Sequence, residues 1–252
     1  MPMSRNLIAA LACRNNGSRL YGKPLQYVDV KNQVSILDNI VASLKKNSNI
    51  NEIVLGISEG IENEIYIEIA NNLNIKYIIG DQDDVLSRLI MCGVLAGATD
   101  IFRVTSESPF RYFERDNEIW NLHVKNENDA TFLDEIVDGC GSEIISLDAL
   151  KISHARGDSR HRSEMCSLYI REHPSEFKVQ KIYPENKFIR RDLRLTVDNP
   201  EDLILCREVY VNFKDYAPDI PLEKIIEYLD INKHLKDLTF RYTEIGYSSM
   251  YI

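Results

Sequence analysis

Paired cysteines are missing from this sequence. The five cysteines are scattered and odd in number, and none belongs to a C-x-x-C pair; they stand at positions 13, 92, 140, 166 and 206. This pattern argues against a disulfide framework and against a zinc site. It is typical of reduced thiols, so we predict a cytoplasmic protein.

Long apolar runs and an excess of positive charge are missing as well. No apolar run approaches the ~20 residues that span a bilayer, and the first residues show no signal-peptide pattern. The formal net charge of −9 argues against nonspecific binding to nucleic acid or anionic membranes, so we expect neither as a partner. The chain of 252 residues, 44% hydrophobic and 27% charged, has a globular composition and room for one large or two small domains.

A basic loop stands out against this acidic background. Residues 7–13 form an apolar run typical of a buried strand, and the next ten residues contain Gly17, Gly22 and three cations, Arg14, Arg19 and Lys23. Glycine lets backbone N–H groups approach an anion that Arg and Lys neutralise, so the loop suits a polyphosphate. It is no Walker A loop, because residue 24 is proline. The alternative is an ordinary basic surface loop.

Strand and helix patterns alternate through the first half of the chain. Strands are predicted at 7–13, 52–58, 76–80 and 100–105, with helices at 35–46, 62–73 and 85–97. This alternation predicts an α/β fold with a mostly parallel central sheet. Because ligands bind beyond the carboxyl ends of such strands, the intervening loops should share one face: 13–23, 58–61, 80–84 and 105–111.

The second half of the chain changes character. Helices are predicted at 117–125, from Leu147, at 200–213 and at 222–229, with strands at 129–133, 138–146, 178–182 and 193–197. Asn199 and Pro200 are typical of a helix start, whereas Asp198 has no such explanation. Glu107 also follows a predicted strand end. A carboxylate at that edge, opposite a phosphate loop, could hold Mg²⁺, although Glu107 alone also fits a solvated loop.

Four segments in order resemble the CMP-sugar synthetases, the cytidylyltransferases for acylneuraminate, 3-deoxy-manno-octulosonate and their relatives. The most similar pattern is the spore-coat polysaccharide branch, and the segments are 14–23, 80–88, 103–110 and 193–202. The resemblance implies a Rossmann-like, nucleotide-diphospho-sugar transferase fold with helices on both faces of the sheet. It implies a nucleotidyltransferase domain at 1–214, with a nucleotide half at about 1–112 and an acceptor and dimer-arm region at about 113–190. A C-terminal helical extension would occupy 215–252.

The same resemblance implies a Mg²⁺-dependent cytidylyltransferase that joins CTP to an acidic sugar and releases pyrophosphate. It would be a homodimer serving surface-polysaccharide biosynthesis. Catalysis would fall to Arg19, Lys23, Glu107 and Asp198, and the metal ligands would be Glu107 and Asp198. The implied nucleotide-binding residues are Arg14, Asn15, Asn16, Gly17, Ser18, Arg19, Lys23, Asp83, Arg88 and Arg103. The implied acceptor-binding residues are Glu143, Arg160, His161 and Arg162.

The sequence departs from the family pattern at several places. The Gly17-Ser18 pair lies one position later than in the relatives, Ser106-Glu107 replaces a glycine-aspartate pair, and Gly141 stands where an aspartate would be. Either the acceptor is unusual or catalytic ability has decayed. For Arg88, an ion pair with Asp84 on the helix surface is the alternative to nucleotide binding.

Three other functions stay open at this stage. The first is a nucleotidyltransferase with another nucleotide, such as UTP, or with a phosphorylated or phosphonate acceptor. The second is a glycosyltransferase, for which Asp81-Gln82-Asp83 would be the metal-binding D-x-D pair, although these residues also suit a helix start. The third is a catalytically degenerate nucleotide-binding subunit.

Overall fold

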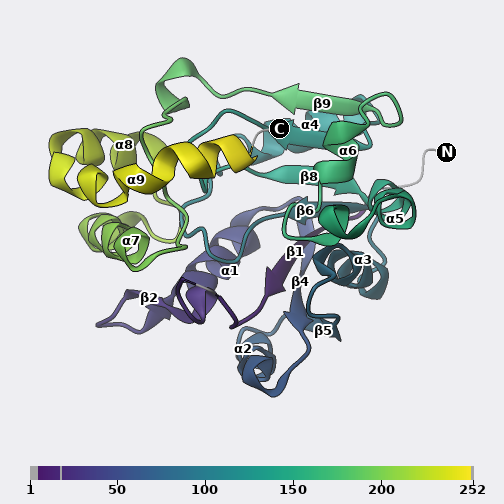
Figure 1. The fold of residues 1–252 in the computed structure, drawn as a ribbon, viewed down its shortest axis with the longest axis horizontal. Coiled ribbons are helices and arrows are strands. Elements are labelled where there is room, and N and C mark those ends of the chain that lie inside the picture. Colours follow the sequence, from purple (N-terminus) through teal and green to yellow (C-terminus); the bar gives the residue numbers. More distant parts are fainter. Residues whose placement is uncertain (1–4, 18, 251–252) are drawn as a thin grey trace.

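The central element of the fold is a seven-stranded sheet in the order β5-β4-β1-β6-β8-β7-β9 (Figure 1). The computed structural model describes residues 5–17 and 19–250. β8 is antiparallel to β6 and β7, whereas the other neighbours in the sheet are parallel. The strands are β1 (Leu7–Cys13), β4 (Ile50–Ser58), β5 (Lys76–Gly80), β6 (Asp100–Arg103), β7 (Ala130–Leu133), β8 (Glu143–Ser146) and β9 (Val179–Ile182). The predicted α/β class with a mostly parallel sheet is confirmed.

Helices cover both faces of this sheet, which agrees with the Rossmann-like architecture that the resemblance implies (Figure 1). Along β1, Leu7, Ala9 and Leu11 join one apolar core, and Ile8 and Ala10 join a second core on the opposite face. This division explains why β1 reads as a continuous apolar run. The helices are α1 (Ile36–Lys46), α2 (Ile65–Asn72), α3 (Val85–Leu95), α4 (Asp116–Lys125), α5 (Leu147–Arg156), α6 (Leu168–Glu172), α7 (Pro200–Phe213), α8 (Leu222–Ile231) and α9 (Lys233–Met250).

Side chains fix several helix starts where the sequence predicts them. Ser35 precedes α1, and its Oγ accepts the N–H of Asp38 at 3.0 Å while the Asp38 carboxylate accepts the N–H of Ser35. Asp84 caps α3 by accepting the N–H of Ser87 at 2.8 Å. The N–H of Asn199 donates to Asp202 at 2.8 Å before α7.

Two predictions about the second half are wrong. Residues 193–197 form no strand, and Arg194 makes only an isolated bridge with Asp138. Their alternating apolar pattern reflects burial of Leu193, Leu195 and Val197 in the core rather than a strand ladder. The tail also contains α8 and α9, where the sequence predicts one helix, and both helices contribute residues to the larger apolar core.

The cysteines and helices agree with the expectations from composition. All five cysteines are buried and unpaired, which confirms the absence of a disulfide framework. Within residues 5–17 and 19–250, no helix combines the length and the apolar character needed to cross a membrane.

Candidate active site

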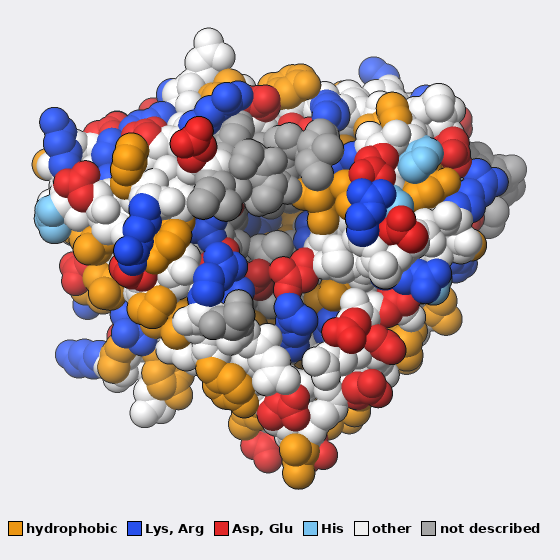
Figure 2. All heavy atoms as spheres, viewed as in Figure 1, with side chains coloured by type: hydrophobic (Ala, Val, Ile, Leu, Met, Phe, Trp, Pro, Cys, Tyr) orange, Lys and Arg blue, Asp and Glu red, His pale blue; other side chains and the backbone are white. Residues whose placement is uncertain are grey.

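Two adjoining cavities open beyond the carboxyl ends of the parallel strands. The smaller cavity, about 240 Å³, lies between the basic loop, the start of α3 and the residues that follow β6. The larger cavity, about 890 Å³, extends from there toward β8, the 159–167 segment and α9. Arg14, Arg19 and Glu107 line both. Figure 2 shows blue and red side chains gathered around a hollow near the middle of this face.

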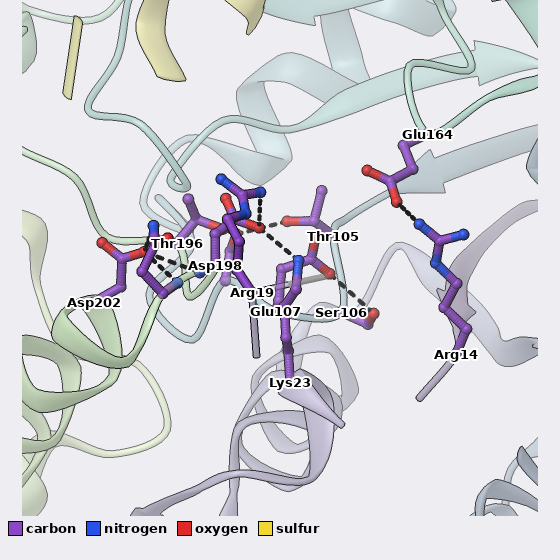
Figure 3. A network of polar contacts seen from close by, with 12 residues as sticks. Arg14, Arg19, Lys23, Thr105, Ser106, Glu107, Glu164, Thr196, Asp198 and Asp202 are labelled. Atoms are coloured by element: carbon purple, nitrogen blue, oxygen red, sulfur yellow. Dashed lines mark hydrogen bonds and ion pairs between the residues drawn. The ribbon is translucent and has the colours of Figure 1, made fainter. Parts of the chain in front are cut away.

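Asp198 is the centre of the polar network between the cavities (Figure 3). Its Oδ1 lies 2.6 Å from Lys23 Nζ and 3.2 Å from an Arg19 guanidinium nitrogen, and Arg194 pairs with its Oδ2. Burial alone would raise the pKa of Asp198. The hydrogen bond and charge of Lys23, with Arg194 and Arg19, outweigh burial and hold that pKa below its usual value. Asp198 is therefore a charged carboxylate held by three cations.

Glu107 lies beside Asp198 because the loop after β6 is bonded to the segment that ends on Asp198. The N–H of Val197 donates to the carbonyl of Glu107 at 3.0 Å, and Ser106 Oγ lies 3.2 Å from Glu107 Oε2. Burial raises the pKa of Glu107, Lys23 lowers it, and the negative charge of Asp198 raises it again. Glu107 and Asp198 are thus close enough for the charge of one to raise the pKa of the other, with Lys23 acting on both.

These two carboxylates fit a Mg²⁺ ion that also binds a triphosphate. Mg²⁺ typically takes one or two carboxylates from a protein and completes its shell with phosphate oxygens and waters. No cluster of three or more His, Cys, Asp or Glu side chains suited to a metal occurs in the part of the chain that the structure describes. Glu107 and Asp198, the two ligands that the resemblance implies, remain the candidates.

Glycines and an asparagine shape the basic loop. Gly22 has a φ of +58°, a left-handed conformation that favours glycine, and its N–H donates to the carbonyl of Asn15 at 2.9 Å. At Gly17, an added Cβ would collide with the carbonyl oxygen of Leu20. Asn15 is buried by its contacts with Glu62 and Asn63, yet its Oδ1 has no hydrogen-bond partner among the described residues.

Arg88 is buried under the smaller cavity. Its Nη1 donates to the carbonyls of Gly56 and Cys13 at 2.9 and 3.2 Å, and its Nε has no partner within the described residues. Burial lowers the pKa of Arg88. The alternative ion pair with Asp84 is not formed in the described structure, because the Asp84 carboxylate caps α3 and pairs with His154 at 2.7 Å. Arg88 Nε and Asn15 Oδ1 are therefore buried polar atoms without a partner among the described residues, in side chains that border the smaller cavity.

Arg103 and Glu143 lie in the wall that leads into the larger cavity. Arg103 pairs with Glu143 at 2.9 Å and donates to the carbonyl of Glu164 at 2.6 Å. Glu143 also contacts Arg171 at 3.0 Å and accepts from Ser167 at 2.7 Å. Burial would raise the pKa of Glu143, but Arg103 and Arg171 lower it to about 2. Glu143 is a charged residue that neutralises two arginines.

Most of the residues singled out from the sequence meet at these cavities. The smaller one is lined by Arg14, Asn15, Asn16, Gly17, Arg19, Lys23, Arg88, Arg103 and Glu107, and the larger one includes Asp83, Glu143 and Asp198. Ser18 lies outside the described residues. Asp81 accepts the N–H groups of Asp83 and Asp84 at 2.8 and 2.9 Å, which supports the helix-start interpretation of Asp81-Gln82-Asp83 over a glycosyltransferase metal pair.

The structure does not bring Arg160, His161 and Arg162 into the described walls of either cavity. Arg160 pairs with Asp158 and Glu172, His161 lies between the same two residues, and Arg162 donates to the carbonyl of His154 at 3.2 Å. Arg160 and His161 are paired within this turn, whereas Arg162 Nε has no partner among the described residues. Ser159 and Ser163, on either side of the three residues, line the larger cavity, so acceptor binding by this turn stays a prediction.

Sequence reasoning gave no role to Arg194, although it quoted the segment that contains it. Arg194 is buried and pairs with Asp138, Asp198 and Asp202. Asp138 itself has a pKa raised to about 6, because burial outweighs the charge of Arg194. Arg194 and Asp198, which flank Thr196 with opposite charges, were the signal available in the sequence. Nothing in the sequence marked Asp138, which lies 56 residues before Arg194 and pairs with it.

Comparisons with known proteins agree with this geometry. No family model matches the chain. An uncharacterised protein of Methanocaldococcus jannaschii is 26% identical over 241 residues, covering 96% of this chain and 97% of the relative. The spore coat polysaccharide biosynthesis protein SpsF of Bacillus subtilis is 23% identical over 229 residues, covering 90% and 95%.

Solved structures share the fold over nearly the whole chain. A cytidylyltransferase from Leptospira borgpetersenii superposes with a TM-score of 0.83 at 18% identity, covering 92% of this chain and 97% of that one. A CMP:2-keto-3-deoxy-manno-octonic acid synthetase complexed with CTP gives a TM-score of 0.60 at 11% identity, covering 82% and 99%. The chain thus has the fold of the cytidylyltransferases, and its motifs and its structure together fit the CMP-sugar synthetase family.

Proposed function

We propose that the protein is a nucleotidyltransferase that transfers the CMP group of CTP to an acceptor oxygen and releases pyrophosphate. One observation carries this proposal: Arg19, Lys23, Glu107 and Asp198 meet at the boundary between a small and a large cavity. A triphosphate at that boundary would meet two cations from one side and two carboxylates from the other. This is the arrangement expected for phosphoryl-group transfer between two substrates.

The nucleotide would occupy the smaller cavity with its phosphates on the basic loop. Arg19 and Lys23, which hold Asp198 in the structure, would turn to the β- and γ-phosphates and release the carboxylate. The acceptor oxygen, entering from the larger cavity, would attack the α-phosphorus in line. The bond from the α-phosphorus to the bridging oxygen breaks, and pyrophosphate leaves with that oxygen. The residues act mainly by positioning and by charge stabilisation.

Cytosine as the base is supported by the likeness to cytidylyltransferases of known structure, one of them complexed with CTP.

Mg²⁺, bound by Glu107 and Asp198, is part of the proposal. When bound, the ion would neutralise charge on the phosphates and lower the pKa of the attacking oxygen. A homodimer, a cytoplasmic location and a role in surface-polysaccharide biosynthesis are further predictions; the last is supported by the likeness to the SpsF protein. An acidic acceptor also stays a prediction: Arg160, His161 and Arg162 are not among the described residues that line the cavities, but Ser159 and Ser163 on either side of them are.

Calorimetric titration with CTP, UTP, ATP and GTP, each with Mg²⁺, tests the nucleotide. Pyrophosphate release with CTP and a panel of 2-keto-3-deoxy acids and sugar phosphates tests the reaction. We expect CTP to bind most tightly and pyrophosphate release to need an acceptor and to disappear in Asp198→Asn. Absence of CTP binding would overturn the proposal. CTP binding without release for any acceptor would favour the degenerate homologue instead.

A further inference from the structure

The walls of the larger cavity carry more negative than positive side chains. Among the described residues, five arginines and seven carboxylates line it, a formal excess of two negative charges. The arginines are Arg14, Arg19, Arg103, Arg171 and Arg194, and the carboxylates are Asp83, Glu107, Asp134, Asp138, Glu143, Glu164 and Asp198. Each arginine is paired with a carboxylate of the same wall. The cavity thus offers a ligand many hydrogen-bonding groups but little net attraction for an anion.

Arg171, on α6, is a tightly held cation of this wall. Its guanidinium makes two bonds to Asp134 at 2.9 and 3.0 Å and one to Glu143 at 3.0 Å. It also stacks on Phe132, 3.9 Å from the ring centroid, and its side chain is only 3% exposed. A ligand carboxylate could bind Arg171 only by displacing a buried carboxylate, which would leave that carboxylate without its cation.

Glu143 also pairs with Arg103 and compensates its charge. It contacts Arg103 at 2.9 Å through one oxygen and Arg171 and Ser167 through the other. Both oxygens of Glu143 are therefore occupied, and both arginines are compensated. A carboxylate entering this region would face Glu143, Asp134 and Asp138 without an uncompensated cation among the described residues that line the cavity.

Neutral hydroxyl groups find acceptors in the larger cavity. The carboxylates that line it accept hydrogen bonds from hydroxyl or ammonium groups.

We infer that the acceptor carries no carboxylate where it contacts the Glu143 region. It is a polyhydroxylated sugar whose body is uncharged or cationic, and any negative charge lies on the attacking group, next to Arg19 and Lys23. Glu143 is the residue that sets this specificity, because together with Asp134 it compensates the charges of Arg103 and Arg171. The inference rests on the proposed nucleotidyl transfer and names the acceptor class for it.

The test compares two sugars that differ in one group. Glucose 1-phosphate and glucuronic acid 1-phosphate share a ring and a phosphate, and differ only in a hydroxymethyl group against a carboxylate. Their affinities for the full-length protein saturated with CTP and Mg²⁺ are measured by calorimetry. We expect the neutral sugar to bind at least about tenfold more tightly, a difference of about 1.4 kcal/mol. Equal affinity, tighter binding of the carboxylate, or no binding of either sugar would overturn the inference.

A Glu143→Gln variant tests the assigned cause. The amide keeps the shape of the side chain but leaves Arg103 and Arg171 with an uncompensated charge, so affinity for glucuronic acid 1-phosphate should rise about tenfold. Glu185→Gln, which removes an exposed carboxylate paired with Lys187, is the matched control and should leave the ratio unchanged. An unchanged ratio in a folded Glu143→Gln protein would contradict the role of Glu143.

The two proposals fail in different ways. If the wild-type protein does not bind CTP, the nucleotidyltransferase proposal is wrong. If it binds CTP and prefers the acidic sugar, that proposal stands and the inference about the acceptor is wrong. Should Glu143→Gln not fold, the comparison of the two sugars with the wild-type protein still decides the acceptor class.

Discussion

Asp198 is the residue on which the account depends most. The sequence makes it a candidate site residue, because helix capping explains Asn199 and Pro200 but not the aspartate before them. The structure gives it Lys23, Arg19 and Arg194 as partners. Lys23 and Arg19 were foreseeable, because a glycine-containing basic loop after a buried strand suits an anion. Arg194 was not, because its role depends on the distant Asp138.

Replacing Lys23 with methionine should weaken CTP binding. Lys23 is mostly buried and lies 2.6 Å from Asp198, so it is positioned to exchange this carboxylate for a phosphate. A charge-assisted hydrogen bond of this kind contributes about 1.5–3 kcal/mol, so the dissociation constant should rise between about tenfold and a hundredfold. Calorimetry measures it. Lys45→Met, on α1 and bonded to the carbonyl of Leu73, is the control and should bind CTP like the wild type. Equal affinities of the two variants would refute this role of Lys23.

Asp138 should make the free energy of unfolding fall as the pH rises. Its folded-state pKa of about 6 lies above the usual value of 3.8, because burial outweighs Arg194, so the folded protein binds the extra proton between these limits. The contribution of Asp138 to the free energy of unfolding should therefore be greatest below pH 4 and fall by up to about 3 kcal/mol as pH rises to 6.

Denaturant unfolding of the wild type and Asp138→Asn between pH 4 and 7 measures this effect. The variant cannot titrate at this position, so the stability of the wild type relative to the variant should decline across the window. A difference that is constant with pH, or that grows, would contradict the elevated pKa.

At the scale of elements, local sequence patterns predicted the helices and strands correctly where a capping residue or an apolar run marks the element. α1 and α7 begin where Ser35 and Asn199 predict, and β1 occupies the whole apolar run. The strand predicted at 193–197 failed because alternating burial in an irregular segment resembles the alternation of a strand. α9 was missed because its sequence is polar and rich in tyrosine, so its apolar face is narrow.

The unpredicted α9 reaches the site through Gly246. Tyr242 and Gly246 line the larger cavity, and a Cβ at Gly246 would collide with the Arg194 guanidinium and the Asp138 carboxylate. Gly246→Ala should therefore displace the helix or the ion pair, and raise the acceptor KM more than the CTP KM. Steady-state kinetics separate the two constants. Glu244→Ala, on an exposed position of the same helix, should change neither. An acceptor KM that stays at the wild-type value in Gly246→Ala would rule out this contribution of α9.

At the scale of the whole molecule, the topology explains why distant motifs meet. β1 and β6 are parallel neighbours, so the basic loop after β1 and the Glu107 loop after β6 emerge at the same edge. A bond from Val197 to Glu107 then brings Asp198 to that edge. The meeting of the basic loop with Glu107 could be expected from a parallel sheet. The second half could not be placed this way, because the antiparallel β8 and the irregular 193–197 segment follow no such rule.

The central claim is that Glu107 and Asp198 act together on one divalent cation in front of the triphosphate of CTP. The most direct test is calorimetric titration of CTP, with and without Mg²⁺, into the wild type, Glu107→Gln, Asp198→Asn and the double variant. We predict that Mg²⁺ tightens CTP binding in the wild type, that each single variant loses most of this gain, and that the double variant loses little more than either one. A gain from Mg²⁺ that survives in both single variants, or losses that simply add, would contradict the account.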